Sequence, residues 1–149
     1  MKTVALRFAD IFAPECGTIA AHEQVIKELG HVWYGKLGSK VSDKMLKTIM
    51  GTEEPKILLI RSGKAERYWA YVCKAQNELP DIKEIPAYYR DNHEKFQTWF
   101  CVTRFEKAPK NVMSECVVAS SGTLLGHASR HSMSPYFIIE TKGKNAEDK

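Results

Sequence analysis

The sequence predicts an α+β domain: a small, mostly antiparallel β-barrel of five to six strands, flanked by two or three short helices. Three observations predict this fold class. Short apolar runs bounded by glycine or proline recur along the chain, two stretches place apolar residues at helical spacing, and 149 residues are enough for one hydrophobic core. Short strands with so few helices favour a barrel with the helices at its sides.

The chain opens with a predicted strand and a predicted helix. Residues 4–8 form a short apolar run, which we interpret as the first strand. Thr18 is expected to cap a helix over residues 18–29, and Gly30 to end it. Five residues of this segment share one helical face: Ile19, His22, Val25, Ile26 and Leu29.

Three further strands and one helix are predicted over residues 31–73. Residues 31–37 form the second strand, and Ser42 caps a short helix that ends at Gly51. Residues 56–60 contain almost only apolar side chains, so we expect both faces of this strand to be covered. After a Ser-Gly-Lys turn, residues 66–73 return as the second arm of a β-hairpin.

The second half of the chain begins with a long polar connection over residues 77–95, which holds Tyr88 and Tyr89. A connection of this length in a compact domain is usually functional or contains a short helix. Three more strands, a brief helix and a charged end follow it. We place the strands at residues 96–105, 117–118 and 135–139, the helix at 124–130, and the charged end at 141–149.

Composition and charge restrict the class of protein only loosely. Hydrophobic residues make up 44% and charged residues 27%, which is typical of a globular domain. The net charge of +4 permits an anionic partner but does not require one. No run approaches the roughly 18 apolar residues of a membrane-spanning helix, and the N-terminus lacks the apolar core of a signal peptide. We therefore expect a cytoplasmic protein without a membrane partner.

The four cysteines do not indicate a metal or redox motif. No two of them are spaced as C-x-x-C, so the sequence does not support a zinc knuckle or a thioredoxin-like site. Cys73 and Cys101 lie in apolar runs, and we expect both to be buried, reduced thiols. We expect no cofactor and no bound metal.

One stretch goes beyond these general patterns. Residues 31–75 read HVWYGKLGSKVSDKMLKTIMGTEEPKILLIRSGKAERYWAYVCKA. This run resembles the first half of a YTH domain: a strand that starts with Val-Trp, a short helix, an Ile-Leu-Ile strand, and a Ser-Gly-Lys turn into a returning strand. The related EVE domain shares this scheme. The strands at residues 99–106 and 135–139 are similar to those of the second half. The resemblance implies a PUA-like barrel that binds nucleic acid, because both families read modified bases.

The resemblance also implies a base-binding pocket with aromatic walls. Trp33 corresponds to the first wall, and Tyr34 to a backbone contact beside it. Tyr88 and Tyr89 stand where those families place the second wall, and Asp10 is nearest to the polar residue that reads the base edge. A base must leave the stack to enter such a pocket, and aromatic stacking offsets that loss.

Cations near this predicted pocket are candidates for phosphate contacts. Lys36 and Lys40 follow Trp33, and Arg61 and Lys64 border the hairpin turn. The leading hypothesis is thus a module that holds a flipped base, modified or plain, in DNA or RNA. A separate nuclease or a defence-system subunit is a possible partner.

The sequence leaves one enzyme hypothesis open, and it contains a histidine pair that we interpret as surface or capping residues. Gly38-Ser39-Lys40 with Asp43 is faintly similar to the Gly-x-Lys motif of ASCH domains, PUA-like barrels that include hydrolases and nucleases. His127 and His131 are spaced to share one helical face, but no H-E-x-x-H pattern accompanies them. A further alternative is an adaptor in a phage or defence system that binds protein rather than nucleic acid. We expect residues 1–140 to form one domain and residues 141–149 a flexible charged tail.

Overall fold

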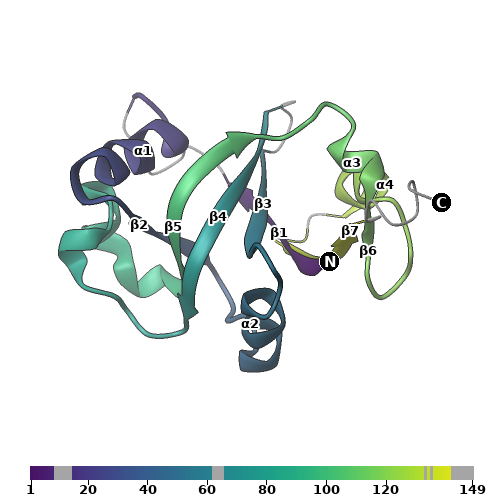
Figure 1. The fold of residues 1–149 in the computed structure, drawn as a ribbon, viewed down its shortest axis with the longest axis horizontal. Coiled ribbons are helices and arrows are strands. Elements are labelled where there is room, and N and C mark those ends of the chain that lie inside the picture. Colours follow the sequence, from purple (N-terminus) through teal and green to yellow (C-terminus); the bar gives the residue numbers. More distant parts are fainter. Residues whose placement is uncertain (9–14, 62–65, 133, 135, 142–149) are drawn as a thin grey trace.

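The computed structural model describes residues 1–8, 15–61, 66–132, 134 and 136–141, and its strands form a single sheet. The sheet has seven strands in the order β2-β5-β4-β3-β1-β7-β6 (Figure 1). Their bounds are β1 (Lys2–Phe8), β2 (Val32–Leu37), β3 (Lys56–Arg61), β4 (Arg67–Gln76), β5 (Phe96–Lys107), β6 (Cys116–Val118) and β7 (Tyr136–Thr141).

The pairing of the strands confirms a mostly antiparallel sheet and corrects two details. Only β1 and β3 run parallel, because α1, β2 and α2 lie between them in the chain. The sheet has one or two strands more than the five to six expected for the barrel, because all seven strand segments placed along the sequence, including the short one at residues 117–118, join it. In addition, β2 and β6 are its edges and do not pair with each other in the described part of the chain, so the sheet is open rather than a closed barrel.

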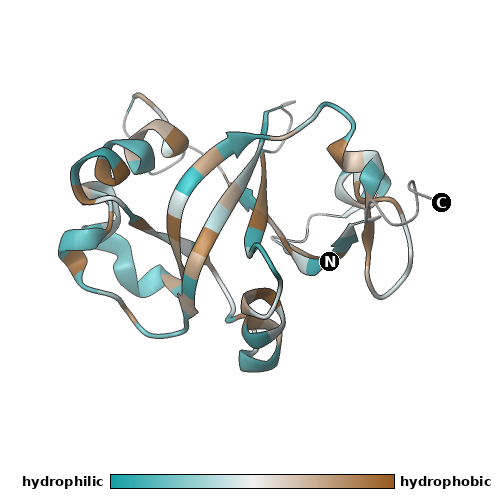
Figure 2. Ribbon diagram, viewed as in Figure 1, coloured by the Kyte–Doolittle hydropathy of each residue, from teal (hydrophilic) through white to brown (hydrophobic). Residues whose placement is uncertain are grey.

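The helices surround the sheet, and there are more of them than the two or three expected. The α-helices are α1 (Thr18–Leu29), α2 (Asp43–Met50), α3 (Val112–Glu115) and α4 (Leu125–His131). The long connection between β4 and β5 contains two 3-10 helices, η1 (Ile82–Glu84) and η2 (Ala87–Lys95). Figure 2 shows that this connection is mainly hydrophilic, which is why no helix could be assigned to it from apolar periodicity.

The helix ends follow the sequence signals closely. Ser42 caps α2, because its side chain accepts a hydrogen bond from the backbone N–H of Met45. Gly30 ends α1 in the left-handed conformation, which glycine adopts without strain. The cap of α1 was misplaced by one residue: Gly17 is the N-cap, and Thr18 is the buried first residue of the helix.

Three apolar clusters hold the fold together. The largest lies between one face of the sheet and the helices α1 and α2, and includes Leu59 and Phe100. A second lies on the opposite face, under α3 and α4, and includes Leu58. Residues 57–60 are buried throughout, so the expectation that both faces of this strand are covered is confirmed. The third cluster lies beneath η1 and η2 and is part of the candidate site.

The cysteines differ from expectation at one position. Cys101 is buried as expected, but Cys73 is exposed. The register between β4 and β5 shifts between Val72 and Lys74, so the strand alternation that would bury Cys73 is broken at this bulge. No helix in the described residues is long and apolar enough to cross a membrane.

Candidate nucleic-acid interface

A cluster of aromatic side chains fills the space between the edge of the sheet and η2. Tyr89 lies at its centre, with its ring centroid 4.5 Å from that of Phe96 and 5.9 Å from that of Trp99. Trp33 and Ile85 complete this buried group. These rings anchor the polar connection to β2 and β5 through apolar contact.

Gly35 allows this close packing. A Cβ atom at this position would lie 2.9 Å from Phe96 Cβ and from Trp99 Cζ3, closer than such atoms can approach. The absence of a side chain on β2 is therefore what lets the two rings of β5 lie flat against it.

His22 of α1 lies beside the aromatic cluster and is completely buried. Its Nδ1 atom is 2.8 Å from the carbonyl oxygen of Thr18, one turn earlier in the helix. Within the part of the chain that the structure describes, its Nε2 atom has no hydrogen-bond partner. Burial lowers the pKa of His22 from 6.5 to about 4, and the Thr18 carbonyl only partly opposes that shift, so the imidazole is neutral at physiological pH.

Four aromatic rings from three elements surround His22. The ring centroids of Tyr34 and Tyr89 lie 5.1 Å from that of His22, and those of Phe105 and Tyr88 lie 6.1 and 6.3 Å away. Phe105 carries no charge, and burial raises the pKa of Tyr89 well above its ordinary value. The histidine therefore lies in an apolar, uncharged environment.

A groove of about 570 Å³ runs between α1 and the η1–η2 connection, on the outer side of these rings. Its floor is apolar and includes Ala21, Val25 and Ile85. Two exposed cations line it from the connection, Lys83 and Arg90, and one exposed carboxylate, Glu28, lines it from α1. Arg90 uses Nε to bind the carbonyl oxygen of Ile82, and its two Nη atoms carry further N–H donors.

Tyr88 links the groove to the buried aromatic cluster. It lines the groove and is only partly buried, whereas its neighbour Tyr89 is buried. The two rings meet edge to face, with centroids 4.6 Å apart. Tyr88 thus offers an aromatic surface to a molecule in the groove, supported from behind by Tyr89.

The other residues predicted to bind the base lie behind this surface. Trp33 and Tyr89 are buried within the aromatic cluster, and Tyr34 is buried in the main core against His22. The structure brings Tyr34, Tyr88 and Tyr89 together around one histidine, but only Tyr88 lines the groove. Asp10 lies outside the described residues.

The cations predicted to bind phosphate do not form one group. Lys36 is buried, and its ammonium donates to the carbonyl oxygens of Leu37 and Ser39. Lys40 is exposed ahead of α2, and Arg61 ends β3 beside Glu66, whose carboxylate is 3.4 Å away. Figure 1 shows α2 at one end of the strands and the last residues of β3 at the other. Lys64 lies outside the described residues.

Two basic residues of the groove were missed at the level of sequence. Lys83 and Arg90 belong to the polar connection around Tyr88, in which no cation stood out from the surrounding charged residues. Their position in the sequence could have indicated them, because Lys83 and Arg90 flank the tyrosine pair within a few residues. His22 was noticed only as a member of an apolar helical face.

The residues of the enzyme hypotheses do not form a reactive centre. Lys40 is exposed, and the Asp43 carboxylate accepts a hydrogen bond from Asn77 at 3.1 Å. A lysine needs desolvation to become a base near neutral pH, and Lys40 lacks it. His127 and His131 pack with ring centroids 4.3 Å apart on the exposed side of α4. Among the described residues, no group of three or more side chains could hold a metal ion.

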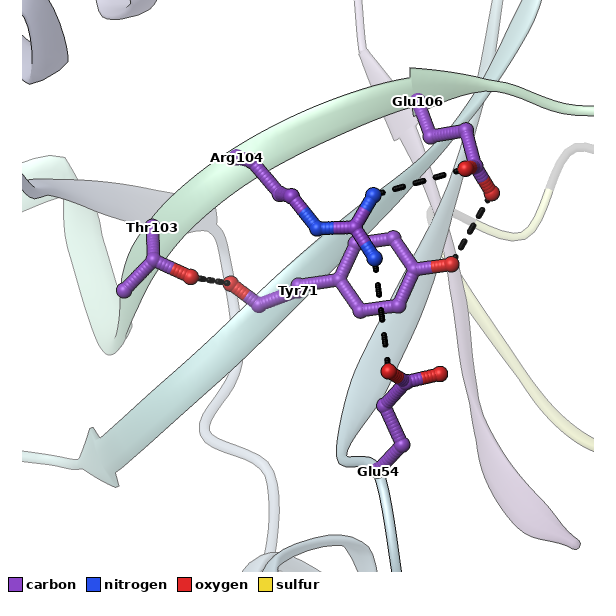
Figure 3. Close-up of polar contacts among 5 residues, drawn as sticks. All are labelled: Glu54, Tyr71, Thr103, Arg104 and Glu106. Carbon is purple, nitrogen blue, oxygen red and sulfur yellow. Dashed lines mark hydrogen bonds and ion pairs between the residues drawn. The ribbon is translucent and has the colours of Figure 1, made fainter.

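A second surface combines cations with aromatic rings, but its charges are already paired. The guanidinium of Arg104 lies over the ring of Tyr71, as Figure 3 shows, with Cζ 3.7 Å from the ring centroid. Glu106 accepts a hydrogen bond from the Tyr71 hydroxyl at 2.9 Å, and it also pairs with Arg104. Glu54 lies 4.0 Å from the same guanidinium. These two carboxylates make this face a poor site for a phosphate.

A family model described as Pua-like matches residues 4–139, which is most of the chain. The chain belongs to the Pua-like family. Domains of this family generally bind nucleic acids. The mixed α+β architecture, with its seven-stranded sheet, agrees with the PUA-like fold. Neither a curated protein nor a solved structure matches the chain. The groove beside Tyr88 is therefore the candidate nucleic-acid interface of this Pua-like domain.

Proposed function

We propose that this Pua-like domain binds nucleic acid along the groove between α1 and the η1–η2 connection, with one base stacked on Tyr88. The observation that carries this proposal is the placement of Tyr88: a partly exposed aromatic ring on an apolar groove that two cations line. Sequence-tolerant binding of single strands uses this combination of stacking surface and positive charge.

Magnitudes favour a base that is already unstacked. Stacking on one aromatic side chain contributes about 1–3 kcal/mol. Extruding a base from a duplex costs a few kcal/mol, which a second aromatic wall would help to offset. Trp33 and Tyr89, the other predicted walls, are buried behind Tyr88. A single exposed wall therefore suits a single strand, a loop or a mismatched base better than an intact duplex.

In this proposal the cations hold the phosphates and the buried rings position Tyr88. Lys83 and Arg90 act on the backbone, so their contribution decreases as salt concentration rises. Trp33, Tyr34 and Tyr89 support Tyr88 and α1 from the interior of the domain. The likeness of residues 31–75 to EVE and YTH domains supports a modified base as one ligand of the groove.

The test is fluorescence anisotropy with labelled single-stranded DNA and RNA octamers at low salt. We expect Tyr88→Ala to weaken binding about five- to a hundredfold, since it removes one stacking contact. Lys83→Glu and Arg90→Glu should weaken binding and flatten its salt dependence. Lys110→Glu is the matched control, because Lys110 is equally exposed but lies beside α3, away from the groove.

Two results would contradict the proposal. One is the absence of binding by any octamer at low salt. The other is a loss with Lys110→Glu as large as that with Lys83→Glu, which would mean that overall charge, and not this groove, attracts the nucleic acid.

A further inference from the structure

The tautomer of His22 is fixed by its own helix. The carbonyl oxygen of Thr18 can only accept a hydrogen bond, and it lies 2.8 Å from Nδ1, so Nδ1 carries the proton. The neutral imidazole then has a lone pair on Nε2. His22 therefore presents a hydrogen-bond acceptor, and not a donor, toward the rings packed against α1.

This acceptor is buried without a donor. Nε2 has no hydrogen-bond partner among the residues that the structure describes. A buried polar atom without a partner destabilises a fold, and an apolar ring of similar size would fill the same space without that loss. A ligand that brings an N–H group to this atom would remove the penalty.

The partly exposed side chain of Tyr88 belongs both to the groove and to the surroundings of His22. Tyr88 lines the groove and lies 6.3 Å from His22 between ring centroids. On α1, Ala21 and Val25 face the groove, while His22 between them faces the sheet. A base that reaches the imidazole from the groove must therefore displace the Tyr88 ring. The other rings around His22 belong to Tyr34, Tyr89 and Phe105, and neither tyrosine hydroxyl forms a hydrogen bond with Nε2 in the part of the chain that the structure describes.

We propose that His22 Nε2 is a recognition atom, which accepts a hydrogen bond from an N–H group on the edge of a base that enters beside Tyr88. This inference rests on the proposed function of the groove. The ligand class is a nucleobase that has a donor on its edge: the amino group of adenine or cytosine, or the ring N–H of uracil, thymine or guanine. A base whose edge has lost its donors is rejected, because Nε2 would stay unpaired beside it.

The test compares ligands that differ only in that donor. Plain octamers first identify the preferred base. For adenine, the probes are then octamers with N6-methyladenine, which keeps one N–H, and N6,N6-dimethyladenine, which has none. The donor-free probes for the other bases are N4,N4-dimethylcytosine, N3-methyluracil or N3-methylthymine, and guanine methylated at N1 and twice at N2. We expect wild type to bind the donor-free octamer about tenfold or more weakly, and His22→Phe to bind both alike. His22→Gln, whose side-chain carbonyl can accept, should restore part of the preference.

A second measurement follows the atom itself. With ¹⁵N-labelled histidine, the His22 Nε2 resonance should shift toward that of a hydrogen-bonded nitrogen when the preferred octamer is added, while Nδ1 stays protonated. Equal discrimination by wild type and His22→Phe, or an unchanged Nε2 resonance at saturation, overturns the inference but leaves the groove intact. Weaker binding of every octamer by Tyr88→Ala supports the groove, whereas binding by His22→Phe that is retained but no longer depends on the base donor supports the role of Nε2, so the two proposals are tested separately. If no octamer binds wild type, the proposed function fails, and this inference fails with it.

Discussion

The ammonium of Lys36 lies 4.3 Å from the ring centroid of Tyr136. Lys36 is on the edge strand β2, and Tyr136 begins β7, near the other end of the sheet order. The contact shows that the open sheet curls until the two strands approach each other, although no backbone pairing joins them in the described residues. A side chain thus bridges a gap that backbone hydrogen bonds would close in a complete barrel.

We expect this contact to stabilise the fold measurably. A desolvated cation over an aromatic ring contributes about 1–2 kcal/mol, and Lys36 is buried. A double-mutant cycle of Lys36→Met and Tyr136→Leu, measured by urea unfolding, should give a coupling of that size. Lys44→Met is the control, because Lys44 is exposed on α2 and should combine additively with Tyr136→Leu. Additive effects of Lys36→Met and Tyr136→Leu would contradict the bridge.

Arg7 ties β1 to the end of α4. Its guanidinium donates to the carbonyl oxygens of Ser129, Ser132 and Ser134 at 2.7–2.9 Å. These carbonyls lie where the last turn of a helix leaves acceptors unpaired. We expect Arg7→Met to lower the free energy of unfolding by about 2–3 kcal/mol, and Arg7→Lys to recover less than half of that loss. Chemical denaturation measures both losses, and the control Lys110→Met should have little effect. Equal stability of Arg7→Lys and wild type would mean that the several donors of the planar guanidinium are not needed.

The thiols should fall into two reactivity classes. Burial raises the pKa of Cys101 to about 12 and that of Cys116 to about 11, so almost no thiolate forms at pH 8. Cys16 and Cys73 are exposed. We expect a colorimetric thiol reagent to modify two cysteines quickly in the native protein and the other two only after unfolding. Mass spectrometry of the modified peptides assigns them, and rapid modification of Cys101 would show that this region opens readily.

Gly35→Ala should be severely destabilising even though it adds only one methyl group. The new Cβ would lie 2.9 Å from Phe96 Cβ and Trp99 Cζ3, and neither ring can withdraw from a packed cluster. We expect a loss of about 2–3 kcal/mol. Gly122→Ala, in a left-handed turn with nothing within 4 Å of its Cβ, is the comparison for backbone strain without a clash. Thermal unfolding of both variants compares the two effects, and we expect Gly35→Ala to have the lower Tm. A near-wild-type Tm for Gly35→Ala would mean that the aromatic cluster is loosely packed.

The sequence predicted what depends on neighbouring residues. The strand of residues 56–61, the cap at Ser42 and the stop at Gly30 follow from local patterns. Prediction from the sequence failed where contacts with distant segments determine the environment of a side chain. Lys36 was predicted to contact phosphate, yet its ammonium lies against Tyr136 of β7, a strand that is distant in the sequence. Cys73 turns outward because of a bulge that only the partner strand defines.

The candidate site shows the same limit. Tyr88 and Tyr89 are adjacent in one polar segment, and no local pattern distinguishes them. Packing against Phe96 and Trp99 buries Tyr89, while Tyr88 is left at the groove. His22 fits the apolar face of α1, and its unpaired nitrogen becomes visible only when the four surrounding rings are in place.

The buried imidazole also makes the stability of this domain depend on pH in a direction that can be worked out. Burial lowers the pKa of His22 from 6.5 to about 4, so between these values the unfolded chain binds a proton that the folded chain does not. The free energy of unfolding is therefore not reduced by His22 above pH 6.5. It decreases as pH falls from 6.5 toward 4, by about 3 kcal/mol in all. Because carboxylates titrate there too, the measurement is the difference between wild type and His22→Phe in urea unfolding at pH 7, 6, 5 and 4.5. We expect the stability of His22→Phe relative to that of wild type to increase steadily as pH falls. A constant difference across this range would mean that the imidazole can be protonated in the folded domain, and hence that water or a charged group reaches Nε2.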